Sequence, residues 1–104
     1  MLRLDSAQRL KLHVAAVFAN NFTNHLLGIA DALLAEAQLP PELLAPLVRE
    51  TVDKALANPP FAMQTGPAVR RDTPTLEAHA AALAAHPAWQ ALYAQLTASI
   101  QSQL

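Results

Sequence analysis

The chain has 104 residues, a length that suits one domain with a single hydrophobic core. Hydrophobic residues make up 53% of the sequence and charged residues only 14%, below the roughly 25% usual for soluble domains. A net charge of -1 provides no basic field for nucleic acid or acidic lipid, so we expect no nucleic-acid partner. Cysteine is absent, which excludes disulfides, thiolate catalysis and cysteine-based zinc sites and fits a cytoplasmic protein.

The distribution of charge predicts a partner chain. No residue after Glu77 is charged, apart from any protonated histidine and the terminal carboxylate. A surface helix normally carries charge on its outer face. We therefore expect part of the surface to be buried against another chain, most simply a second copy in a homodimer.

A long first helix is the element around which the rest of the chain is expected to be organised. Asp5 is its predicted N-cap, Gln8 completes a capping box, and the helix is expected to run to about Gln38. At about 100° per residue, one face is apolar and comprises Phe18, Phe22, Leu26, Ile29 and Leu33. The uncharged polar residues His13, Asn20 and Asn24 line the opposite face. This pattern predicts a central helix with little of its circumference facing water.

Two further features of this helix bear on its environment. Three asparagines and two histidines in its middle make a membrane span costly, so we expect no membrane insertion. Gly28 costs roughly 1 kcal/mol relative to alanine inside a helix, which predicts close approach of another backbone or a ligand. The polar face is either a hydrogen-bonded helix–helix contact or part of a functional site.

The remainder of the chain is also predicted to be helical. A second helix follows Pro40-Pro41, ends at Asn58 and forms an antiparallel hairpin with the first, with a small distortion at Pro46. After a possible helical turn over residues 61–64, Asp72 or Thr73 caps a third helix, and Pro87 begins a fourth. No strand pattern is present. The fold class is therefore all-α, with four main helices in a single domain over residues 1–104.

One loop remains as a candidate for a binding or catalytic site formed by this chain alone. With Gly28 and Gly66 as the only glycines, glycine-rich phosphate-binding motifs are excluded. The histidines lack the spacing of a helical metal site, so no metal is expected. Residues 65–72, TGPAVRRD, combine a hydroxyl, backbone N–H groups, two guanidiniums and a carboxylate. This loop is either a capped turn in which Asp72 pairs with an arginine, or an anion-binding loop with Arg70 as the main contact.

Three segments carry a resemblance to a known family: HVAAVFANNFTNHLLGIADALL, LAPLVRETVDKAL and QTGPAVRRDTPTLEAH. They resemble the C-terminal helical domain of unknown function found in bacterial proteins with a Rossmann-like NAD(P)-binding domain in front. That domain is similar in fold to the helical C-terminal domains of 6-phosphogluconate dehydrogenase-like and pyrroline-carboxylate reductase-like enzymes. The resemblance implies that this chain supplies dimer contacts and one wall of a substrate cleft. It also implies that NAD(P) binds on a separate Rossmann domain and not on this chain.

The resemblance also implies a set of candidate site residues. His13 and Asn21 match the family's helix motif, and Pro67 lies within its loop motif. Together with the neighbouring asparagines, the candidate substrate-binding residues are Asn20, Asn21, Asn24, Thr65, Gly66, Arg70, Asp72 and His79.

The sequence departs from the family in two ways. Family members commonly have glycine where this chain has Arg71, which is expected to alter the turn. Related hydroxyacid dehydrogenases place a catalytic lysine about one turn before an Asn-Asn pair, and the matching position here is Val17. Lys11 lies too far away to substitute, so the dehydrogenase mechanism is not transferred. His13 is left as the candidate for a proton-transfer role.

These observations favour a helical dimerisation and substrate-lining domain of an NAD(P)-dependent oxidoreductase-like protein, inactive by itself. The start of the chain, just before the first family helix, predicts an excised domain or a short gene without the Rossmann half. An alternative is a stand-alone helical interaction module that binds a small ligand or a protein. A third is part of an enzyme whose Rossmann domain is a separate chain.

Overall fold

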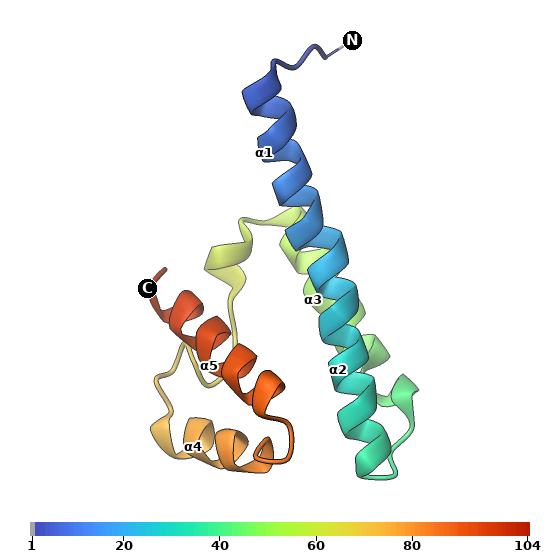
Figure 1. The fold of residues 1–104 in the computed structure, drawn as a ribbon, viewed down its shortest axis with the longest axis vertical. Helices are drawn as coiled ribbons and strands as arrows, with labels where there is room; N and C mark the ends of the chain where they lie inside the picture. Colours follow the sequence, from blue (N-terminus) through green and yellow to red (C-terminus); the bar gives the residue numbers. More distant parts are fainter. Residues whose placement is uncertain (1) are drawn as a thin grey trace. The chain divides into compact units, whose positions relative to one another are not determined.

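The computed structural model describes residues 2–104, and helices are the regular elements throughout that range (Figure 1). This confirms the all-α fold class with four main helices. None of the helices in residues 2–104 is long and apolar enough to cross a membrane. The chain divides into two compact units, Met1–Leu44 and Ala45–Leu104, which are described separately here. The expected single domain and the expected hairpin of the first two helices would each include residues of both units. Both therefore stay predictions.

The first unit is built on one long helix. Its parts are α1 (Ser6–Ala16), η1 (Val17–Phe22) and α2 (Thr23–Glu36), which follow one another without interruption (Figure 1). At its start, the Asp5 carboxylate accepts a 2.8 Å hydrogen bond from the backbone N–H of Gln8. The Gln8 side chain in turn accepts a 3.0 Å bond from the backbone N–H of Asp5, which confirms the predicted capping box.

The middle of this helix is not α-helical. η1 is a π-helix, in which each N–H bonds to the carbonyl five residues earlier instead of four. The prediction of a uniform α-helical period is therefore wrong over Val17–Phe22. Because a π-helical turn contains more residues than an α-helical turn, the side chains after it do not lie where a 100° period places them. The residue types of Val17–Phe22 do not distinguish a π-helix from an α-helix.

By itself, the chain leaves most of the long helix exposed, and the expected burial of this helix stays a prediction. Every residue from Leu12 to Gly28 is exposed except Val17, which is half-buried. Apart from its long helix, the first unit has only the short 3-10 helix η2 (Pro41–Leu44), so it has no second layer of its own against which to bury an apolar face. No atom of the first unit lies within 4 Å of the position that a Cβ would take at Gly28, and the expected close approach of another backbone or a ligand stays a prediction.

In the second unit, prolines mark where helices begin. Pro46 lies in the first turn of its helix and does not distort its interior, where a missing N–H would cost a hydrogen bond. Pro59 precedes a 3-10 turn, which confirms the predicted turn with a shift of one residue. Asp72 caps the next helix as predicted. The elements are α3 (Ala45–Ala57), η3 (Pro60–Met63), α4 (Thr73–Ala82) and α5 (Pro87–Gln101).

The best-buried side chains of the described residues lie in this second unit. Ala68, in the loop before α4, is 5% exposed, and Leu83, at the end of α4, is 8% exposed. Two glutamines of α5 form hydrogen bonds with the loop before α4 and with α4 itself. Gln101 donates a 3.3 Å hydrogen bond to the carbonyl of Ala68, and Gln90 donates a 2.7 Å bond to the carbonyl of Ala80. The loop of residues 64–72 is thus held against α5.

Candidate functional site

The predicted site residues fall into two groups, one in each unit. His13, with the three asparagines Asn20, Asn21 and Asn24, lies on the long helix of the first unit. The second unit contains Thr65, Gly66, Arg70, Asp72 and His79. A substrate cleft formed by both groups of residues stays a prediction.

The asparagines of the first unit flank and occupy the π-helical segment. Asn20 and Asn21 lie inside η1, and Asn24 lies in the first turn of α2. Their side chains are exposed and, among residues 2–104, they make no side-chain hydrogen bond. Within the first unit no such contact is formed, and the alternative of a hydrogen-bonded helix–helix contact stays a prediction. π-helical turns frequently occur at functional sites, which makes this segment a reasonable place for ligand or partner contacts.

The loop of the second unit is a tight turn with two residues in the left-handed region. Gly66 has φ 105°, which glycine adopts readily because it has no Cβ, and Arg71 has φ 50°. Backbone bonds from Asp72 N to Pro67 O (3.0 Å) and from Arg71 N to Ala68 O (3.2 Å) close the turn. Arg71 thus adopts the conformation that glycine favours, at the position where family members commonly carry glycine. The expected effect of Arg71 on this turn stays a prediction.

Asp72 joins this loop to α4. Its carboxylate accepts a 2.8 Å hydrogen bond from the hydroxyl of Thr75 and a 3.3 Å bond from the backbone N–H of Thr75. An Arg70 nitrogen lies 3.7 Å from a carboxylate oxygen of Asp72. The hydroxyl bond, the backbone bond and the Arg70 charge together lower the pKa of Asp72 below its usual value, although desolvation opposes them. The loop is therefore a capped turn in which Asp72 pairs with Arg70, and the Arg70 side chain stays largely exposed.

His79 is an exposed residue of α4 that contacts α5. Its Nδ1 atom is 2.8 Å from the hydroxyl oxygen of Tyr93, and the two rings meet edge to face with centroids 5.7 Å apart. Tyr93 also lines a hollow of about 270 Å³ between α4 and α5. This predicted substrate residue therefore connects two helices.

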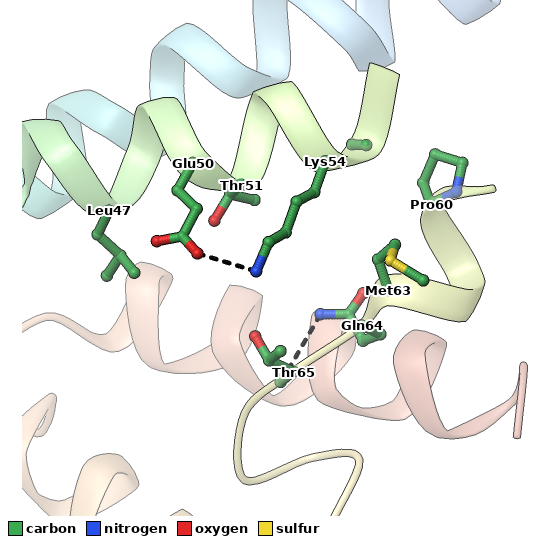
Figure 2. A pocket seen from close by; sticks show the side chains of 9 residues that line it. Leu47, Glu50, Thr51, Lys54, Pro60, Met63, Gln64 and Thr65 are labelled. Carbon is green, nitrogen blue, oxygen red and sulfur yellow. Dashed lines mark hydrogen bonds and ion pairs between the residues drawn. The ribbon is translucent and has the colours of Figure 1, made fainter. Parts of the chain in front are cut away.

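A larger pocket, of about 360 Å³, lies between α3 and η3 (Figure 2). Its apolar wall includes Leu47 and Met63, and its polar groups are the Glu50–Lys54 ion pair at 2.8 Å, Thr51, Gln64 and Thr65. The hydrogen bond and charge of Lys54 lower the pKa of Glu50. Pockets of this size can accommodate small molecules. Of the predicted site residues, Thr65 lines this pocket.

The sequence reasoning missed most of this pocket. Neither Glu50 nor Lys54 was among the predicted site residues. A usable signal was present, because residues 47, 50, 51, 54 and 55 follow the spacing of one helix face. Three of these five positions are polar or charged, which distinguishes the face from a core-facing stripe.

The family of this chain follows from its sequence over nearly the full length. Residues 1–100 match the model of a domain of unknown function, DUF2520, and the chain belongs to that family. No curated protein matches the chain.

Among solved structures, the chain is similar to the putative NADP oxidoreductase BF3122 from Bacteroides fragilis. The two share 44% sequence identity and a TM-score of 0.91, over 95% of this chain. The chain spans 38% of the length of that protein. The expected relation to a part of Rossmann-containing oxidoreductase-like proteins is therefore confirmed.

Proposed function

We propose that this chain is the dimerising and substrate-lining helical part of an NADP-dependent oxidoreductase and that it has no catalytic activity by itself. The observation that carries the proposal is the 44% identity to 38% of a protein named as an NADP oxidoreductase. At that identity the matched part has the same fold, and it accounts for a minority of the relative's chain.

NADP does not fit the residues of this chain. Dinucleotide sites use a glycine-rich turn between a strand and a helix. Here the two glycines lie inside α2 and in the loop before α4, and residues 2–104 contain no strand. The cofactor in the proposed enzyme is therefore held by a Rossmann-type domain outside these 104 residues.

Exposed apolar side chains support the dimerising role. The long helix alone exposes Leu10, Phe18 and Phe22, and α3 exposes Leu47 and Leu56. Large apolar patches on a soluble protein mark surfaces that contact another chain. The long helix carries no Lys, Arg, Asp or Glu between Leu12 and Ala30, which lowers the cost of covering its apolar side chains, because no such ionised group loses water there.

A second candidate function is a stand-alone module that binds a small ligand. The pocket between α3 and η3 favours it, because that pocket is formed entirely within the second unit. It combines an apolar wall with an ammonium, a carboxylate and two hydroxyls. This candidate requires saturable binding to the 104-residue chain without any cofactor domain.

The main test is a chimera in which this chain replaces the matching part of the Bacteroides fragilis protein. NADPH affinity is measured by fluorescence titration, and molar mass by light scattering, for the chimera, the parent protein and this chain alone. We expect the chimera to bind NADPH within about tenfold of the parent and to form a dimer, since 44% identity preserves the fold. We expect this chain alone to form a dimer without binding NADPH.

Two results would contradict the proposal. One is NADPH binding by the isolated chain with an affinity close to that of the parent protein. The other is a monomeric chain at every concentration tested, which would remove the dimerising role. A thermal shift with a small-molecule library, reduced by Thr51→Val and unchanged by Thr97→Val outside the pocket, would favour the ligand-binding module.

A further inference from the structure

One row of apolar side chains runs along the long helix at a spacing of four residues. This apolar row consists of Leu10, Val14, Phe18, Phe22 and Leu26. Its members are between 40% and 66% exposed. The rings of Phe18 and Phe22 meet edge to face with centroids 5.0 Å apart, which places them on the same side of the helix. The row is therefore a continuous surface feature.

The π-helical turn keeps the row straight. In an α-helix, four residues overshoot a full turn by about 40°, so a row at this spacing winds around the helix. In a π-helix the turn contains more residues, so four residues fall short of a full turn. The step from Phe18 to Phe22 lies inside η1. It therefore rotates around the helix axis in the direction opposite to the α-helical steps before and after it. A purely α-helical segment would spread these side chains over a much wider arc.

We propose that the apolar row packs against the same row of a second copy of the chain, antiparallel, around a two-fold axis level with Asn20. This proposal rests on the proposed dimerising function and assigns its interface. About such an axis, Val14 faces Leu26 of the second copy and Phe18 faces Phe22 of the second copy. The same pairs recur on the other side of the axis, as a two-fold interface requires.

Charge complementarity favours the second copy and the antiparallel direction. Before the proposed axis at Asn20, the charged residues of the long helix and the segment before it are Arg3, Asp5, Arg9 and Lys11, a net charge of +2. After the axis, Asp31 and Glu36 of the long helix give a net charge of -2. No charged residue lies between Leu12 and Ala30. Antiparallel pairing about Asn20 sets Arg9 opposite Asp31, whereas parallel pairing sets like charges together.

The exposed area is also sufficient. Side chains of this size at these exposures offer on the order of 100 Å² each, so the row offers roughly 500 Å² per chain. Two rows bury roughly 1,000 Å², which is the area that a specific interface needs. The row spans 16 residues, or about 24 Å of helix, so contact extends well beyond one turn.

Cysteine cross-linking tests the direction and register, because the chain has no cysteine of its own. A Val14→Cys chain is mixed with a Leu26→Cys chain, oxidised and separated by mass. The proposal expects the mixed 14–26 disulfide and little of either homodimer, since equivalent positions 14 lie about 18 Å apart in an antiparallel pair. Dominant 14–14 and 26–26 products would overturn it, as would a dimer that forms no mixed product.

Aspartate substitutions test the row itself, with Leu12 as a matched control. Phe18 and Leu12 are 64% and 59% exposed on the same helix, but Leu12 is not in the row. We expect Phe18→Asp to weaken dimerisation at least a hundredfold in a dilution series and Leu12→Asp to change it less than threefold. Circular dichroism checks that both variants remain helical. If Phe18→Asp does not fold, the cross-linking result decides.

A charge exchange tests the pairing of the ends. Arg9→Glu and Asp31→Arg are each expected to weaken dimerisation by about two- to fivefold, and the double variant to restore it. The controls distinguish a failure of the proposed dimerising function from a failure of the proposed interface. A wild-type chain that stays monomeric would overturn the dimerising function together with this interface. A wild-type dimer that Leu12→Asp disrupts and Phe18→Asp does not would overturn the interface alone.

Discussion

The Nδ1 atom of His79 on α4 lies 2.8 Å from the hydroxyl oxygen of Tyr93 on α5. The pair joins the two helices in addition to the hydrogen bond from Gln90 to the carbonyl of Ala80, beside a hollow whose apolar lining includes Leu76 and Ala94. The family resemblance implied a substrate-contacting role for His79. The structure gives this residue a connecting role within the second unit, which a stability measurement can detect without a substrate.

Removal of the tyrosine hydroxyl is expected to loosen this connection. Tyr93→Phe deletes the hydrogen bond and keeps the ring, so we expect the free energy of unfolding to fall by about 0.5–1.5 kcal/mol in urea titrations. The control is the same change in a His79→Leu background, where the bond is already absent and the loss is expected to be close to zero. Equal losses in both backgrounds would show that the bond contributes nothing.

Replacement of the two glycines by alanine is expected to change the stability of the chain in opposite directions. Gly66 has φ 105°, so Gly66→Ala is expected to lower the free energy of unfolding by about 1–3 kcal/mol through backbone strain. Gly28 lies in α2 with open space around its Cα, so Gly28→Ala is expected to raise helix stability by up to about 1 kcal/mol. Thermal unfolding of both variants checks this. A destabilised Gly28→Ala dimer would indicate that a partner chain closely approaches Gly28.

The family's usual glycine is expected to suit position 71 better than arginine does. Arg71 has φ 50°, which costs an L-residue about 1–2 kcal/mol. Arg71→Gly relieves that cost and adds an entropic penalty of roughly 0.5–1 kcal/mol, so a net gain of about 0.5–1 kcal/mol is expected in urea titrations. Arg70→Gly, at a position without a positive φ, should destabilise the chain. A loss of stability in Arg71→Gly would show that the arginine side chain has an additional role.

The Asp72 cap predicts a specific pH dependence. Hydrogen bonds from Thr75 and the charge of Arg70 lower the pKa of Asp72 in the folded state. A lowered pKa stabilises the fold above the usual pKa of the carboxyl group, and this contribution is lost as the pH falls through the folded-state pKa. Between about pH 5 and about pH 2, the urea midpoint of the wild type should therefore fall more than that of Asp72→Asn. Parallel pH profiles would contradict the assignment.

The asparagines provide a comparison between sequence and structure on the long helix. Capping by Asp5 and Gln8 and the helical nature of the segment were predictable, because both depend on residues a few positions apart. The π-helical turn was not predictable, since it changes the hydrogen-bond period without any distinctive residue type. Asn20 and Asn24, which were selected from the polar face of the predicted helix, therefore stay candidates, and they make no side-chain hydrogen bond within residues 2–104.

The all-α class, the proline-marked helix starts and the Asp72 cap were predictable from the sequence. Each of these is a local property, fixed by backbone conformation or by hydrogen bonds over three or four residues. The contact of His79 with Tyr93, the hydrogen bond from Gln101 to the carbonyl of Ala68, and the pocket that Glu50 and Thr65 line were not predictable and depend on tertiary packing. Those contacts join residues 14 to 33 positions apart, and their formation depends on how the helices of the second unit pack.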